Sequence, residues 1–198
     1  GTLFNYNGKF TKAKKRAYDQ ASKAMYAIIS KAKQLKLPID IQLHLFDSVV
    51  KPILLYGCEV WGLEDCKIIE KIHLKFCKII LGVSQYTSTA MVYGELGRMP
   101  MSIAIKTRMV SYWHKLLTCP GSKLSSVFYK LLYNLDCNGY FHSSWLKAIK
   151  TILDECGLSY TWHGQNVIRG ISTEWLKAKI KLSLQDQCIK AGDCMTRS

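Results

Sequence analysis

Apolar residues recur at spacings of three and four along most of this chain, and beyond its first few residues no stretch alternates apolar with polar side chains for long. The first pattern is typical of amphipathic α-helices, whereas sustained alternation is typical of half-buried strands. A chain of 198 residues is also long enough to bury a sizeable core. The sequence therefore predicts a mostly α fold, a multi-helix bundle with at most a short strand at the N-terminus.

The first expected helix, 11–35, has suitable boundary residues, because Thr11 can act as an N-cap and Pro38 follows its end. Pro38 can open a second helix, which Pro52 should interrupt or kink. The core face of that helix would comprise Ile41, Leu45, Phe46, Val49 and Val50, and the apolar run 53–56 should be buried on most faces. Further helices are expected at 64–81, 101–118, 124–135, 144–155 and 174–189. We divide the chain into residues 1–10, a helical region 11–83, connecting helices 84–118 and a weaker helical region 119–198.

The charge of the chain is strongly one-sided. It carries 28 Lys and Arg against 14 Asp and Glu, a formal net charge of +14. Such an excess favours polyanionic partners, either nucleic acid or an anionic membrane surface. The charge is also uneven, because residues 1–36 hold nine basic side chains and only one acidic side chain.

Helix 11–35 should gather this charge on the face opposite its apolar stripe. The expected stripe comprises Ala17, Ala21, Ala24, Ile28 and Leu35. The opposite face carries Lys12, Lys15, Arg16 and Lys23. A second basic ridge on helix 64–81 comprises Lys67, Lys71, Lys75 and Lys78. A ridge of this kind suits phosphates along a duplex backbone, although an ordinary solvated helix face carries the same pattern.

We do not expect the eight cysteines to form the disulfide framework of a small secreted domain, because the chain is long and apolar enough to fold without disulfide bonds. It has neither an Asn-x-Ser/Thr sequon nor a segment of signal-peptide type. No uncharged run is as long as the roughly 20 residues of a membrane-spanning helix. We therefore expect reduced, mostly buried thiols, no membrane insertion, and a location in the cytosol or nucleus.

The sequence offers little catalytic chemistry. No two aspartates are adjacent, whereas phosphoryl transfer with two metal ions needs clustered carboxylates. A zinc site could use His73 and Cys77 with Cys58 and Cys66, but tight cysteine pairs are missing. We interpret Cys77 as a buried thiol beside a surface histidine, and we expect no metal, no cofactor and no catalytic residues. Gly94 and Gly97 are interpreted as a turn between two helices.

Five tryptophans raise the question of base stacking, because aromatic rings interleaved with basic residues can form stacking platforms. Trp113 lies close in sequence to Arg108 and Lys115, so we expect it to contact nucleic acid. The other four are expected in the core: Trp61, Trp145, Trp162 and Trp175.

Two strings of residues are more specific than a helical pattern. One runs Pro52-Ile53-Leu54-Leu55-Tyr56-Gly57 and is followed by Trp61-Gly62. The other runs Tyr93-Gly94-Glu95-Leu96-Gly97-Arg98 and is followed by Pro100. They resemble the segment that follows the polymerase palm in the reverse transcriptases of non-LTR (LINE-type) retrotransposons. The resemblance covers most of the chain, is strongest from Leu45 to Trp113, and becomes thinner after about Cys119.

This resemblance implies that residues 1–10 end a palm-like strand and that residues 11–83 are a thumb-like region. In such polymerases the thumb follows the template–primer duplex, which implies phosphate contacts for the basic helix. The nucleic-acid-binding residues that we expect are Lys9, Lys12, Lys15, Arg16, Lys23, Arg98, Arg108 and Trp113.

The catalytic aspartates and the endonuclease of that family have no counterpart in this sequence. We therefore expect a non-catalytic C-terminal fragment, or a decayed copy, of an RNA-directed DNA polymerase. Its partners would be an RNA/DNA template–primer duplex and the palm and fingers of the parent polymerase. Two alternatives stay open: a helical protein–protein interaction module, and an element relic with no present activity.

Overall fold

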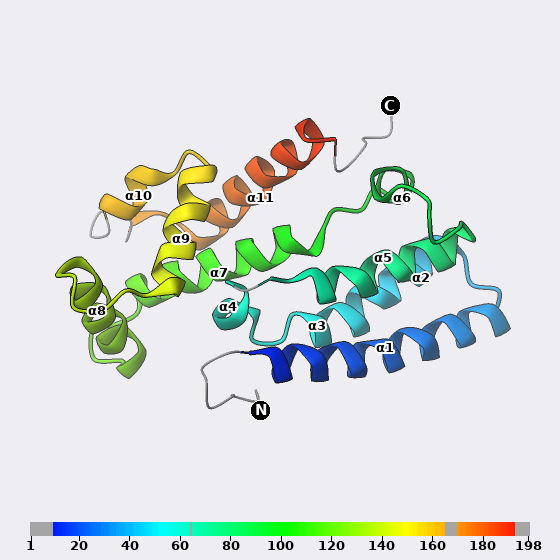
Figure 1. Cartoon of the computed structure of the whole chain (residues 1–198), viewed down its shortest axis with the longest axis horizontal. Helices are drawn as coiled ribbons and strands as arrows, with labels where there is room; N and C mark the ends of the chain where they lie inside the picture. Colours follow the sequence, from blue (N-terminus) through cyan, green and yellow to red (C-terminus); the bar gives the residue numbers. More distant parts are fainter. Residues whose placement is uncertain (1–9, 64, 165–169, 193–198) are drawn as a thin grey trace. The chain divides into compact units, whose positions relative to one another are not determined.

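The computed structural model describes residues 10–63, 65–164 and 170–192, and every regular element within these ranges is helical (Figure 1). The prediction of a mostly α fold is confirmed. The strand expected at residues 1–10 falls almost wholly on residues 1–9, which lie outside the described ranges.

The chain divides into two compact units whose segments interleave along the sequence. Unit 1 comprises Gly1–Gly57, Asp65–Ser102 and Cys188–Ser198, and unit 2 comprises Cys58–Glu64 and Ile103–Gln187. The four regions drawn from the sequence alone remain a prediction of how the chain is organised.

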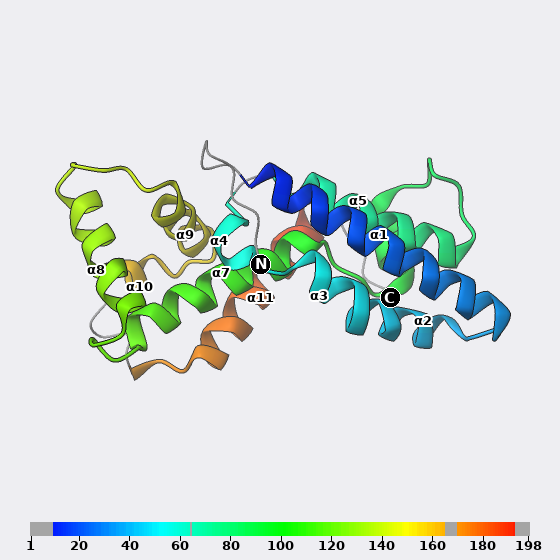
Figure 2. The same cartoon turned by 90° about the horizontal axis from the view of Figure 1, so that it is seen from below.

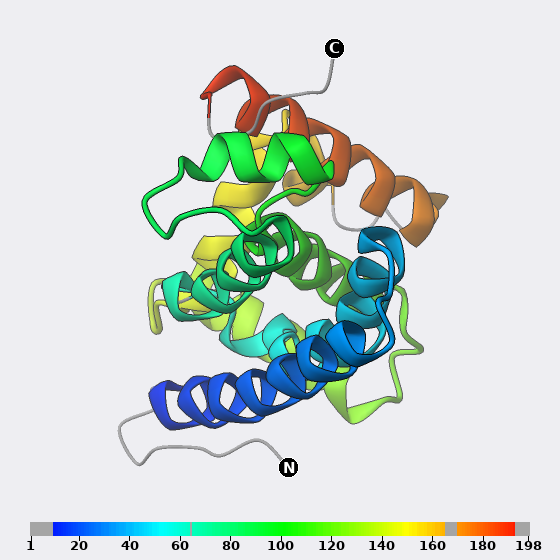
Figure 3. The ribbon, with the colours of Figure 1, turned by 90° about the vertical axis from the view of Figure 1, so that its right-hand side faces the viewer.

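Unit 1 is built around a long helix that packs against several shorter ones. Its elements are α1 (Thr11–Gln34), α2 (Ile39–Leu45), the π-helical turn η1 (Phe46–Val50), α3 (Lys51–Leu54), α5 (Lys67–Leu81) and α6 (Thr89–Leu96). Helix α1 packs against α2, η1, α3 and α5, and α5 also packs against α6 (Figures 2 and 3). The fully buried large side chains of this unit include Met25, Phe46, Leu54, Ile69, Ile72 and Phe76.

Helix α1 is rotated relative to the stripe expected from its sequence. Phe10 rather than Thr11 is the N-cap, and Leu35 lies beyond the last helical residue with 67% of its surface exposed. The buried positions are Lys14, Ala21, Met25, Ile29 and Ala32. Lys14 can occupy a core position because its Nζ donates to the backbone carbonyl of Asp65 at 3.1 Å.

A π-helical turn accommodates Pro52. The N–H of Lys51 donates to the carbonyl of Phe46, five residues earlier, so α2, η1 and α3 follow one another without a break. Proline has no N–H, and its ring crowds the carbonyl four residues before it, so a widened turn relieves both problems. Pro52 therefore coincides with a widened turn of this helical segment rather than with the interruption that the sequence predicted.

The side chains that face inward from this helical segment differ from those expected. Phe46 and Val50 are buried, whereas Ile41 and Val49, expected in the core, are exposed. In the apolar run that follows, Leu54 and Leu55 are fully buried but Tyr56 is exposed. The prediction that this run is buried on most faces is therefore correct for only part of it.

Unit 2 contains α4 (Cys58–Trp61), α8 (Leu124–Cys137), α9 (Ser144–Glu155), α10 (Ser159–His163), and most of α7 (Met101–Thr118) and α11 (Thr173–Lys190). The expected bounds of α7 and α9 are confirmed, whereas the short helices α4, α6 and α10 were not predicted. The core of unit 2 is formed by Trp61, Ile105, Met109, Trp113, Leu146, Ile149, Leu153, Trp162, Leu176 and Ile180.

Candidate nucleic-acid interface

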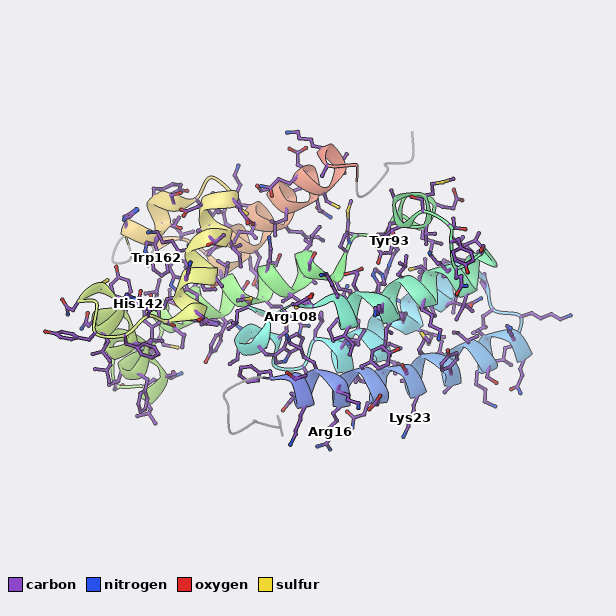
Figure 4. The ribbon with its side chains drawn as sticks, in the orientation of Figure 1. Arg16, Lys23, Tyr93, Arg108, His142 and Trp162 are labelled. Carbon is purple, nitrogen blue, oxygen red and sulfur yellow. The ribbon has the colours of Figure 1, made fainter. Side chains whose placement is uncertain are left out.

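The outer face of α1 carries a row of exposed basic side chains. We call Lys12, Lys15, Arg16 and Lys23 the α1 basic face, and all four are exposed. Arg16 and Lys23 extend from α1 away from the rest of unit 1 (Figure 4). Within the described part of the chain, none of the four forms an ion pair. Their charges are therefore available to an external anion.

One basic side chain of α5 lies close to α1. Lys75 is exposed, and its Nζ lies 5.2 Å from the centre of the Tyr26 ring on α1. A hydrogen bond with Tyr26 raises the pKa of Lys75. The second ridge expected from the sequence is less uniform, because Lys67 pairs with Asp65 and Lys78 donates to the carbonyl of Gln85. Lys71 is exposed.

Arg98 is not part of such a surface. Its Nη1 and Nη2 donate to the two carboxylate oxygens of Asp47 at 2.6 and 2.7 Å, and its guanidinium lies over the Phe46 ring. Burial opposes ionisation of Asp47, but the hydrogen bonds and charge of Arg98 outweigh it and lower the pKa of the carboxyl group. Because both Nη atoms of Arg98 already donate within unit 1, Arg98 is a poor phosphate ligand. The expectation for Arg98 therefore does not fit the structure.

Arg98 belongs to a buried polar network around His73. The carboxylate of Glu70 accepts hydrogen bonds from the Tyr93 hydroxyl and, at 2.7 Å, from the Met101 backbone N–H. His73 Nδ1 lies 3.3 Å from Glu70 Oε1, and Arg98 Nε–H donates to His73 Nε2 at 3.4 Å. The neutral imidazole protonated at Nδ1 satisfies both contacts. Side chains from α5, α6 and the turn between α6 and α7 are thereby joined.

The network also corrects the interpretation of His73 as a surface residue, since only 1% of it is exposed. Burial lowers the pKa of His73, and burial raises the pKa of the neighbouring Cys77 thiol to about 12. Cys77 is buried as expected. Among the described residues, no three His, Cys, Asp or Glu side chains are grouped as metal ligands would be. His73 thus lies in the interior of unit 1, in contact with Glu70 and Arg98.

The two predicted contacts in unit 2 have different surroundings. Arg108 is exposed on α7, with Nη1 3.9 Å from Glu59 Oε1. Trp113 is fully buried, donates its indole N–H to the Tyr129 hydroxyl at 2.9 Å and stacks on Trp162. A ring enclosed on both faces cannot stack on a base, so the expectation for Trp113 is wrong. Of the tryptophans expected in the core, Trp175 is 45% exposed.

Lys9 lies outside the described residues. Gly97 occupies a left-handed conformation at the end of α6, as a turn glycine should, whereas Gly94 is buried inside that helix. The candidate site is therefore the α1 basic face, with Lys75 of α5 beside Tyr26 of α1.

None of the described helices combines the length and apolarity that a membrane span requires. Comparisons of the chain with known protein families, with curated proteins and with solved structures found no match.

Proposed function

We propose that this chain is a non-catalytic part of a retrotransposon-type RNA-directed DNA polymerase that grips a template–primer duplex through the α1 basic face. The single observation that carries the proposal is the set of four exposed cationic side chains on one helix, without ion-pair partners in the described residues. The resemblance noted in the sequence supplies the kind of duplex and the parent enzyme, whose palm and fingers would be the other partners.

The electrostatics favour binding that is independent of sequence. Lysine and arginine side chains on a helix reach phosphate oxygens, which fix position without reading bases. Because each neutralised phosphate releases counterions, four contacts give a slope of about −3.6 in a plot of log K against log salt. The excess of basic over acidic side chains in the whole chain adds long-range attraction to any polyanion.

The test measures the affinity of the full chain for an RNA–DNA template–primer duplex by fluorescence anisotropy across a salt series. One variant replaces Lys12, Lys15, Arg16 and Lys23 by Glu. The matched control replaces four exposed lysines of α9 and α11 by Glu, namely Lys147, Lys150, Lys179 and Lys181. Both variants change the net charge by the same amount, so a difference between them reports position rather than total charge.

The proposal requires steep salt dependence that is lost in the α1 variant and largely kept in the control, with circular dichroism showing that both are folded. Equal weakening in the two variants would mean that only net charge matters and would refute a specific α1 site. Weak binding with a flat salt dependence in the unaltered chain would favour a protein-docking module or an inert relic.

A further inference from the structure

Helix α8 of unit 2 presents apolar side chains to solvent. Leu124, Val127, Phe128 and Leu131 are between 48% and 70% exposed. Their spacing of three, four and seven residues places them on one face of the helix, which we call the α8 apolar face. Single exposed apolar residues are ordinary, whereas a continuous stripe marks a surface that another molecule covers.

The stripe continues into a surface pocket of about 350 Å³ within unit 2. Phe128 belongs to both, and the pocket walls come from α4, α7, α8 and α9. Its apolar lining includes Val60, Tyr112, Leu116, Tyr129 and Leu132. A ridge of side chains beside a shallow apolar hollow is the geometry that receives one face of an amphipathic helix.

Basic side chains border this surface, and the acidic Glu59, which precedes the pocket residue Val60, lies 3.9 Å from Arg108 Nη1. Lys123 precedes α8 and Lys130 lies within it, both exposed and neither in an ion pair among the described residues. On a helical projection at about 100° per residue they border the edge of the stripe that is farther from the pocket. Lys115 of α7 is also exposed, next to the pocket residue Leu116. Asp136, the only acidic residue of α8, accepts the Ser143 backbone N–H at 2.8 Å.

We propose that the α8 apolar face and its pocket bind an acidic amphipathic helix of another protein. The apolar face of that helix would cover Leu124, Phe128 and Leu131, and carboxylates at its edges would meet Lys123 and Lys130. A second copy of this chain fits poorly, because it would bring another net charge of +14 to a border that is already positive. A nucleic-acid backbone would leave the apolar side chains uncovered.

The probe is a synthetic 18-residue peptide with leucines at helical spacing and glutamates on both sides of the leucine stripe. A control peptide has lysine at every glutamate position and the same leucines. Binding of each labelled peptide to the full chain is measured by fluorescence anisotropy. The glutamate peptide should bind at least about tenfold more tightly than the lysine peptide, because rim charges of the wrong sign repel.

Two sets of variants locate the site. The double variant Phe128→Ser with Leu131→Ser should weaken the glutamate peptide by about tenfold or more, as loss of central apolar anchors does. Its control is Leu182→Ser, which alters a leucine of α11 that is also exposed, at 63%, and should change nothing. The double variant Lys123→Glu with Lys130→Glu should reverse the preference between the two peptides. Because it alters only exposed residues, this reversal tests the proposal even if the serine variant unfolds.

Absence of binding by the glutamate peptide overturns the proposal, and so does equal affinity for the two peptides. A dimer in sedimentation experiments that the Phe128→Ser, Leu131→Ser variant abolishes would show that a second copy covers the surface, which also overturns it. None of these variants touches α1, and the Phe128→Ser, Leu131→Ser variant also keeps the net charge, so its duplex affinity should stay unchanged and the two proposals fail separately.

Discussion

The strength of the ion pair between Arg98 and Asp47 decides whether Arg98 stabilises unit 1 or is available to bind a phosphate. Its two hydrogen bonds are short and parallel, and the Arg98 side chain is only 14% exposed while that of Asp47 is 35% exposed. Two unit charges about 4 Å apart at an effective dielectric constant of about 20 attract by about 4 kcal/mol. Desolvation of the guanidinium and solvent screening at the carboxylate reduce this attraction. We expect a coupling energy of about 2 kcal/mol in a double-mutant cycle.

The cycle uses Arg98→Met, Asp47→Asn and the double variant, with the free energy of unfolding measured by urea denaturation followed by circular dichroism. Arg98→Met should destabilise the chain by about 2–3 kcal/mol, because it leaves a part-buried carboxylate whose remaining ion-pair partner among the described residues is Lys51, 3.4 Å away. The salt slope of duplex binding should stay the same. A coupling energy below about 0.5 kcal/mol, together with a slope shallower by about 0.9, would refute the structural role and restore Arg98 as a phosphate contact.

Three further predictions concern the interiors of the two units. Trp113→Ala should cost about 3–5 kcal/mol of stability and Tyr129→Phe about 1 kcal/mol, both measurable by urea denaturation; equal, small losses would contradict the buried hydrogen bond. Gly62→Ala should cost about 1–3 kcal/mol, because an added Cβ would lie 2.6 Å from the backbone carbonyl of Cys58; an unchanged urea midpoint would contradict this packing. Burial lowers the pKa of His73 below its ordinary 6.5, so the unfolded chain binds more protons, and stability should fall as the pH drops below about 6.5. Urea midpoints between pH 7.5 and 5.5 test this, and a flat profile would contradict a neutral, buried imidazole.

Long helices with clear periodicity were predictable from the sequence. The bounds of α7 and α9 match expectation because Ile105, Met109, Ile149 and Leu153 fall at helical spacing and are all buried. The sequence predicted helix α1 but not which of its faces is buried. Its expected stripe consists largely of alanines, and these small side chains mark a buried helix face only weakly. The sequence also does not reveal that the Lys14 ammonium reaches the carbonyl of Asp65.

The roles of Arg98 and Trp113 depend on partners far away in the sequence. Asp47 lies 51 residues before Arg98, and Tyr129 lies 16 residues after Trp113, so neither contact leaves a local pattern. His73 could have been placed correctly. It is four residues after Ile69 and four before Cys77, on the buried face of α5, and a histidine at such a position is more consistent with the core than with the surface.

The residues that carry the family resemblance and those that carry the proposed function are different. Pro52 is accommodated by the π-helical turn, Tyr93 donates to Glu70 and Arg98 pairs with Asp47, so these residues serve the fold of unit 1. The α1 basic face contributes nothing to either characteristic string. Mutations should therefore affect stability and duplex binding independently. Reversing the charges of the α1 basic face should abolish duplex binding with little loss of stability, because surface charges contribute little to folding. Arg98→Met should do the opposite, since it removes a contact inside unit 1 and none that a phosphate could reach.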